Sequence, residues 1–124
     1  MIYTASFAQV TRIGDKVPIA VSNGLPKWYH GARYKKLAPP FDLVRLFKAI
    51  EHPDEDDRVM YINSYMDAVL KNLDPQKVEQ ELMKITGGKD AVLLTQEASN
   101  EFSHRHIIRM WLQDAGINSE ELVR

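Results

Sequence analysis

The stretch DAVLLTQEASNEFSHRHIIRMWLQDAG, residues 90–116, decides the fold. Its apolar run Ala91–Gln96 predicts a buried strand, and apolar residues at helical spacing from Ile107 to Ala115 predict a helix that begins near Ser103. Gly116 is suited to end that helix. A strand that is apolar throughout, rather than at alternate positions, is covered on both faces, which is typical of a parallel sheet between helices.

Before this stretch in the chain, two short apolar runs predict strands and three stretches with one apolar face predict helices. The strands are Ile2–Phe7 and Val17–Val21, and the helices span residues 41–50, 58–73 and 74–86. Residues 25–40 show neither periodicity and are expected to form a long loop. We therefore expect a single α/β domain over residues 1–124, with three layers and a mostly parallel sheet flanked by helices.

Composition excludes several classes of protein. The 124 residues include no cysteine, so disulfides, thiolate metal ligands and thiol nucleophiles are absent. No apolar run approaches the roughly 18 residues of a membrane-spanning helix, and the N-terminal residues do not resemble a secretory signal. We expect a cytoplasmic protein that does not contact membranes.

Positive charge is concentrated near the N-terminus. Residues 1–40 hold six Lys and Arg residues against Asp15 alone, although the whole chain has a net charge of −1. In loop 25–40, Lys27 and Arg33 alternate with Trp28 and Tyr34, a combination that binds nucleotides or single-stranded nucleic acid by stacking and charge. Two alternatives remain open: the cations pair with the acidic residues 51–57, or the aromatic residues pack on the domain.

Polar residues follow each predicted strand, at Ser6, Ser22 and the segment 95–103. Because parallel strands end at one edge of the sheet, these exits predict a ligand site there. Ser103 begins the last helix, where free backbone N–H groups attract anions. Ser103 is either a nucleophile or an N-cap, and the N-cap explanation is favoured.

Three residues beside Ser103 carry the candidate chemistry. Glu97, at the third strand's exit, and His104 are the expected acid–base pair. The open alternatives are that Glu97 holds a ribose hydroxyl or orients Arg105, and that His104 is a buried core residue. Arg105 is expected on the wetter side of the helix, where it would clamp a phosphate, or else pair with Glu97 or Glu101. The four histidines form no metal-ligand pattern, and no phosphate-binding glycine motif is present, so neither a metal nor a cofactor is expected.

Several segments resemble domain-of-unknown-function family 488, the YeaO-like proteins. They are Ile2–Ser6, Gly24–Tyr29, Gly31–Tyr34, Leu37–Pro39, and Leu93–Glu97 with Ser103–Arg105. The resemblance implies a Rossmann-like α/β fold. It also implies cysteines at two positions that Thr95 and Ser103 occupy here, so the cysteine chemistry of that pattern does not transfer to this chain.

These observations lead to two functional hypotheses. In the first, the strand edge binds a nucleotide or a nucleic-acid phosphate, and the protein is a small enzyme of nucleotide or nucleic-acid metabolism. In the second, the domain is a non-catalytic module that contacts a protein partner through loop 25–40. Clustering of Glu97, His104, Arg105 and Lys27 in one pocket would favour the first hypothesis, and a flat exposed aromatic patch would favour the second.

Overall fold

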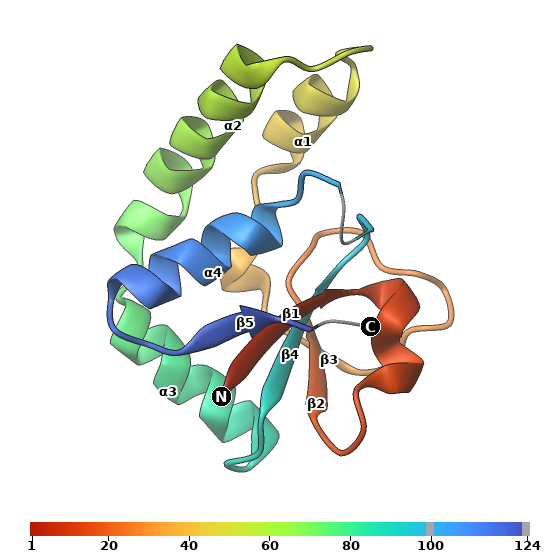
Figure 1. Cartoon of the computed structure of the whole chain (residues 1–124), viewed down its shortest axis with the longest axis vertical. Helices are drawn as coiled ribbons and strands as arrows, with labels where there is room; N and C mark the ends of the chain where they lie inside the picture. Colours follow the sequence, from red (N-terminus) through yellow and green to blue (C-terminus); the bar gives the residue numbers. More distant parts are fainter. Residues whose placement is uncertain (99–100, 123–124) are drawn as a thin grey trace.

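The computed structural model describes residues 1–98 and 101–122, which form a five-stranded sheet with the order β3-β2-β4-β1-β5 (Figure 1). Every pair of neighbouring strands is parallel. The strands are β1 (Ile2–Ser6), β2 (Val17–Ala20), β3 (Ala32–Arg33), β4 (Ala91–Thr95) and β5 (Ser119–Glu121). The expectation of a small three-layer, Rossmann-like α/β domain is confirmed.

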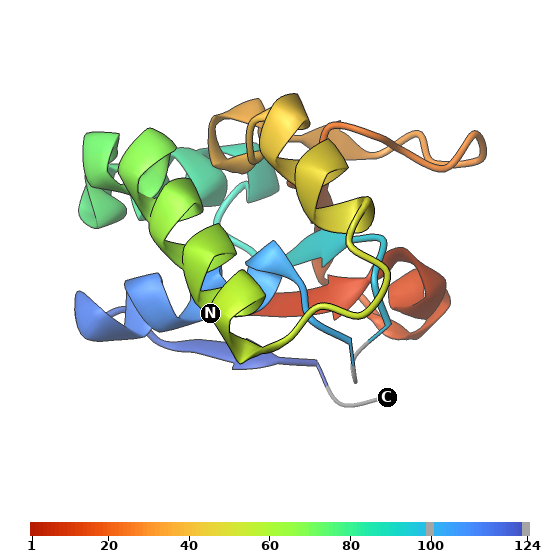
Figure 2. The same cartoon turned by 90° about the horizontal axis from the view of Figure 1, so that it is seen from above.

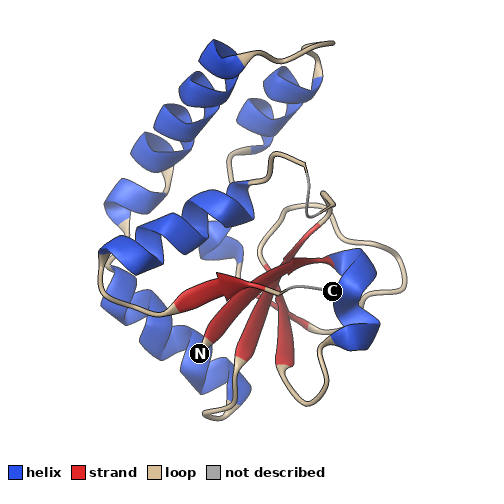
Figure 3. Ribbon diagram, in the orientation of Figure 1, coloured by secondary structure: helices blue, strands red, loops and turns tan. Residues whose placement is uncertain are grey.

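Within the described ranges, four α-helices and three short 3₁₀ helices connect the strands. The α-helices are α1 (Phe41–Lys48), α2 (Glu55–Ala68), α3 (Pro75–Thr86) and α4 (His104–Asp114), and the 3₁₀ helices are η1 (Phe7–Arg12), η2 (Lys35–Leu37) and η3 (Leu70–Asn72) (Figure 3). Local sequence fixes their ends: Asp74 caps α3 ahead of Pro75, and Gly87 ends α3 with a φ of 67°.

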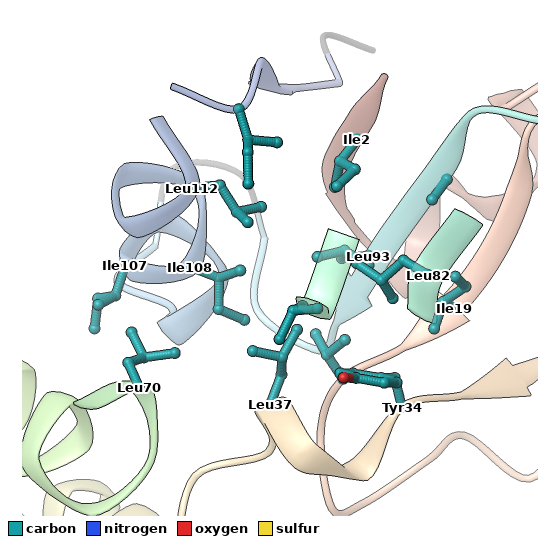
Figure 4. Close-up of a cluster of buried hydrophobic side chains, with 14 of the residues drawn as sticks. Ile2, Ile19, Tyr34, Leu37, Leu70, Leu82, Leu93, Ile107, Ile108 and Leu112 are labelled. Atoms are coloured by element: carbon teal, nitrogen blue, oxygen red, sulfur yellow. The ribbon is translucent and has the colours of Figure 1, made fainter. Parts of the chain in front are cut away.

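The two faces of the sheet are buried by different elements. On one face, Ile2, Ile19 and Leu93 pack against buried side chains of α3 and α4, such as Leu82 and Ile108 (Figure 4). On the other face, a smaller cluster contains Ala5 and Leu94 together with Phe7 of η1 and Tyr29. The buried α-helical side chains thus gather on one face, while a 3₁₀ helix and a loop cover the other.

Strand register brings the predicted exits together. Ser6 is the partner of Thr95, and Ala20 is the partner of Leu94, so β1, β2 and β4 end level with one another. Side chains alternate along a strand, which puts Thr4 and Thr95 on the face that α4 covers. The start of α4 therefore lies over the ends of the central strands.

Helices α1 and α2 form a pair that extends from the sheet, as the view from above also shows (Figure 2). Helix α1 contains no fully buried residue, and its Phe41 and Leu46 are each 66% exposed. Helix α2 begins at Glu55 rather than at the expected residue 58, because Asp54 and Asp57 form a reciprocal capping box. The pair thus stands at the edge where the strands end.

Two strands were not predicted. β3 has two residues and β5 reads Ser-Glu-Glu, so neither has the apolar run that marks a buried strand. Both are edge strands, where a single ladder of hydrogen bonds is enough. Among the described residues, every helix is too short or too polar to cross a membrane.

Candidate functional site

A pocket of about 500 Å³ opens where β2 and β4 end, beneath α1 and beside the start of α4. This volume lies within the usual range for small-molecule sites, about 300–1,000 Å³. Polar side chains form one part of the lining, the polar wall, and aromatic and aliphatic side chains form another part, the aromatic wall. The lining residues are Ser22, Asn23, Gly24, Pro39, Phe41, Val44, Phe47, Lys48, Ile50, Pro53, Tyr61, Gln96, Glu97, Glu101, Phe102, Ser103 and His104.

The polar wall is held by a chain of hydrogen bonds with a fixed direction. The Ser103 hydroxyl donates to Glu97 Oε1 at 2.9 Å. Because its single proton is used there, the 2.9 Å contact between Thr95 Oγ1 and Ser103 Oγ has Thr95 as the donor. Ser103 Oγ also accepts from the backbone N–H of Arg105 at 3.3 Å, as an N-cap does. Both lone pairs of Ser103 are therefore engaged, which favours the N-cap role over a nucleophile.

Arg105 is fully buried, with no exposed surface, and the expectation that it faces solvent as a phosphate clamp is wrong. Its Nε and Nη2 donate to the Glu121 carboxylate at 2.9–3.2 Å. Its Nη1 donates at 2.7 Å both to Thr95 Oγ1 and to the backbone oxygen of Glu97. The side chain turns inward because β5, which was not predicted, supplies its counter-ion. Arg105 thus supports the pocket wall from behind.

The carboxylate of Glu121 is held by several donors at once. Thr4 Oγ1 donates to Glu121 Oε1 at 2.6 Å, in addition to the bonds from Arg105. Burial by itself raises the pKa of Glu121, but the hydrogen bonds from Arg105 and Thr4 outweigh burial, so its pKa lies below the ordinary value. Glu121 therefore stays ionised beside the buried guanidinium.

His104 is 5% exposed and lines the pocket. Its Nε2 lies 2.8 Å from the backbone oxygen of Val21, which can only accept, so Nε2 carries the proton. Burial lowers the pKa of His104 more than Val21 and the charge of Glu97 raise it. The imidazole is therefore neutral near pH 7, with Nδ1 as its acceptor.

Three aromatic rings belong to the aromatic wall. The centroid distances are 5.1 Å between Phe47 and Tyr61, 5.2 Å between Phe47 and Phe102, and 5.3 Å between Tyr61 and Phe102. Burial, together with the nearby charge of Glu97, raises the pKa of Tyr61, so its phenol is neutral. Tyr61 is 6% exposed, so the surface on which a flat ligand can pack comes from the partly exposed Phe47 and Phe102.

The pocket brings together four of the predicted site residues, namely Ser22, Glu97, Ser103 and His104. Ser22 uses its hydroxyl to donate to the Gly24 backbone oxygen at 2.8 Å. Ser6 lies at the same edge, but it is buried, and its backbone N–H donates to Gln9 Oε1 at 3.0 Å. Ser6 is not among the residues that line the pocket.

Pro39 is the residue of loop 25–40 in the pocket lining, and the predicted ligand-binding residues of the loop do not line the pocket. Tyr34 is buried in the main core, its hydroxyl donating to Glu81, so the expectation that its ring is a stacking surface is wrong. Arg33 donates to the Asn23 backbone oxygen at 3.2 Å, and Lys27 is exposed outside the pocket lining. Trp28 is 54% exposed, with its ring edge-to-face with Phe7. The aromatic residues of the loop thus pack largely on the domain rather than forming one surface.

Sequence reasoning missed Thr95 and Glu121 as supports of the site and Phe47, Tyr61 and Phe102 as its aromatic wall. The aromatic residues were interpreted only as parts of apolar helix faces or left unassigned, and their convergence depends on how α1, α2 and the segment before α4 pack. Within residues 1–98 and 101–122, no three His, Asp or Glu side chains gather in a way that could hold a metal ion.

Comparison with known proteins gives one match. The family model described as DUF488-N3a, active DUF488-N3 subclade, matches residues 4–116, which include the whole pocket lining. No curated protein and no solved structure matches the chain.

Proposed function

Because the chain belongs to the DUF488-N3a subclade, whose description calls it active, we propose that it is a small enzyme domain. In this proposal the 500 Å³ pocket binds the nucleoside part of a nucleotide or nucleic acid, and Glu97 is the acid–base group. The reaction class is one that moves a proton at a hydroxyl or water beside the bound nucleoside.

One observation carries the proposal. Glu97 Oε1 accepts from Ser103 at 2.9 Å on the polar wall of a pocket that Phe47, Tyr61 and Phe102 also line. A base or other flat ring can stack on the aromatic wall, and a sugar hydroxyl or water can then reach the carboxylate. A pocket with one apolar wall and a few fixed polar groups is what orients a small substrate.

The hydrogen-bond chain supports Glu97 in this role. Arg105 holds the backbone oxygen of Glu97 and Ser103 holds one carboxylate oxygen, so the residue is fixed at two points. Oε1 of Glu97 accepts the hydrogen bond from Ser103. In this proposal Oε2 of Glu97 is therefore the oxygen that contacts the ligand. A positioned carboxylate needs no further reorganisation when it accepts a proton, which is the benefit of a preorganised site.

His104 is the second polar group of the reaction. Its Nε2–H is committed to Val21, so Nδ1 presents a lone pair rather than a positive charge. A neutral imidazole next to a carboxylate can accept a hydrogen bond or receive the proton that Glu97 gives up. The pair therefore supplies two acceptors, a carboxyl oxygen of Glu97 and Nδ1 of the neutral His104 imidazole.

The proposal is tested by incubating the protein with a panel of nucleosides and their 5′-monophosphates, with binding followed by ligand-observed NMR and turnover by chromatography. Glu97→Gln keeps the size of the side chain and is expected to lower turnover by about 10²-fold or more. Asp114→Asn removes an exposed carboxylate at the far end of α4 and should leave turnover unchanged. If no compound of the panel binds or reacts, the proposed function is wrong.

A further inference from the structure

The charges around the pocket are not those of a phosphate site. Its lining includes two carboxylates, Glu97 and Glu101, and one ammonium group, Lys48. His104 adds no charge, since burial lowers its pKa and leaves it neutral near pH 7. The described lining is therefore net negative.

The cations that the sequence offers for phosphate lie outside the pocket lining, Lys27 as an exposed side chain and three others in contacts elsewhere. Arg105 pairs with Glu121, Lys36 pairs with Glu81 at 3.1 Å, and Arg33 donates to a backbone oxygen beside the pocket. None of these three lines the pocket. At the start of α4, where an anion would gain from the helix dipole, Ser103 caps the helix and the carboxylate of Glu97 is bound to it.

The aromatic wall adds to this preference. Faces of aromatic rings carry negative potential and attract cations within about 6 Å. Phe47, Tyr61 and Phe102 line the same pocket as Glu97 and Glu101. A flat ligand that is neutral or positively charged thus meets stacking surface and carboxylates together, whereas a phosphate ester meets two like charges.

We infer that the pocket selects an aromatic base or nucleoside that is neutral or cationic, and discriminates against the same nucleoside carrying a 5′-phosphate. This inference rests on the proposed function, because it assigns the ligand class of the same pocket. A unit charge about 4 Å from a like charge changes affinity roughly fivefold even in water, and a phosphate monoester carries more than one charge. Adenosine is therefore expected to bind at least about fivefold more tightly than adenosine 5′-monophosphate.

The experiment is calorimetric titration of the full chain with three probes at an ionic strength of about 10 mM, where screening is weak. The probes are adenosine, adenosine 5′-monophosphate and the cationic 1-methyladenosine. The expected order of affinity is 1-methyladenosine at or above adenosine, with the monophosphate weakest. Raising the salt to about 1 M should bring the adenosine and monophosphate affinities together.

Two exposed residues of the lining provide matched variants. Glu101→Gln keeps an oxygen for the backbone N–H of Ala98 and removes one negative charge, so it should narrow the gap between adenosine and its monophosphate. Lys48→Gln removes the positive charge and should widen that gap. Lys84→Gln, on the distant helix α3, should leave the gap unchanged.

The possible failures are distinguishable. If the monophosphate binds as tightly as adenosine, or if Glu101→Gln and salt leave the gap unchanged, the charge selectivity is overturned while the nucleoside pocket stands. If none of the three probes binds, the proposed function fails and the inference fails with it.

Discussion

The hydroxyl oxygens of Thr95 and Ser103 lie 2.9 Å apart, one at the end of β4 and the other at the start of α4. This contact joins a buried guanidinium on one side to a pocket carboxylate on the other, through Arg105, Thr95, Ser103 and Glu97 in turn. Each donor in the chain has an acceptor, and arginine can only donate, so the direction of the protons is fixed. The position of the Glu97 carboxylate in the pocket depends on this direction of hydrogen bonding, from Arg105 to Glu97.

Replacing Thr95 by valine tests that order. Thr95→Val keeps the shape of the side chain but removes the hydroxyl. Arg105 Nη1 then loses this acceptor, and Ser103 Oγ loses this donor. We expect a loss of about 1–3 kcal/mol in the free energy of unfolding, measured with urea. Thr95→Ser keeps the hydroxyl and should retain most of the stability; equal losses in both variants would contradict the role of the hydroxyl.

Replacing Glu121 by glutamine tests the buried ion pair. The guanidinium of Arg105 has no exposed surface, so removal of its counter-ion leaves an uncompensated charge. We expect the free energy of unfolding to fall by on the order of 3 kcal/mol. This is the lower end of the range for breaking a buried ion pair, because the Glu121 side chain is 19% exposed. Glu120→Gln, the exposed neighbour on β5, should change stability by less than about 0.5 kcal/mol.

The same pair predicts how stability changes in acid. The pKa of Glu121 is lower in the folded than in the unfolded chain, because the hydrogen bonds from Arg105 and Thr4 outweigh the effect of burial. Its contribution is therefore complete above the unfolded value of about 4.3 and is lost as the pH falls through the folded pKa. When urea unfolding is measured between pH 6 and pH 3, the free energy of unfolding should decrease less with falling pH in Glu121→Gln than in the wild type.

His104 predicts a second pH window. Burial lowers its pKa in the folded protein, so the unfolded chain binds this proton more readily. Stability from the neutral imidazole is complete above the unfolded pKa of about 6.5 and declines below it. His106, whose pKa is also lowered by burial, contributes in the same direction. His104→Gln should make the free energy of unfolding depend less on pH between pH 7 and pH 5. An unchanged slope of this free energy against pH would show that His104 is not the group responsible.

Gly31 is predicted to resist substitution for a steric reason. A Cβ at this position would lie 2.5 Å from the Tyr29 hydroxyl and 2.7 Å from Tyr29 Cζ. The ring cannot move freely, because it is buried and its hydroxyl donates to the Ala32 backbone oxygen at 2.6 Å. Gly31→Ala should lower the unfolding free energy by about 1–3 kcal/mol. Gly24→Ala, which meets only Gln96 Nε2 at 3.2 Å, should cost less.

Most of the framework was predictable because it depends on local pattern. The continuous apolar runs of β1, β2 and β4 identified a parallel sheet, and the caps at Asp74 and Ser103 set the starts of α3 and α4. The short edge strands β3 and β5 were not predictable, since backbone pairing with a neighbour, rather than an apolar run, makes them strands. Because these two strands were not predicted, the positions of Arg105 and Tyr34 were predicted wrongly.

The misjudged site residues follow from those missing strands. Helical periodicity put Arg105 on the wet side of α4, but β5 covers that side and brings Glu121 to the guanidinium. Loop 25–40 contains β3 and η2, which carry Tyr34 into the core. Glu97, Ser103 and His104 line one pocket because a strand exit and the following helix start are close in sequence, and their functional roles stay predictions. The distant partners required tertiary structure.

The position of Glu121 along the chain bears on how the protein matures on the ribosome. Arg105 emerges sixteen residues before its counter-ion, a delay of about 1–3 s at ordinary rates of translation. During that interval the guanidinium has no carboxylate from β5, and the support for Ser103 and Glu97 is incomplete. The wall of the pocket that Ser103 and Glu97 form is therefore fully supported only once β5 has paired with β1.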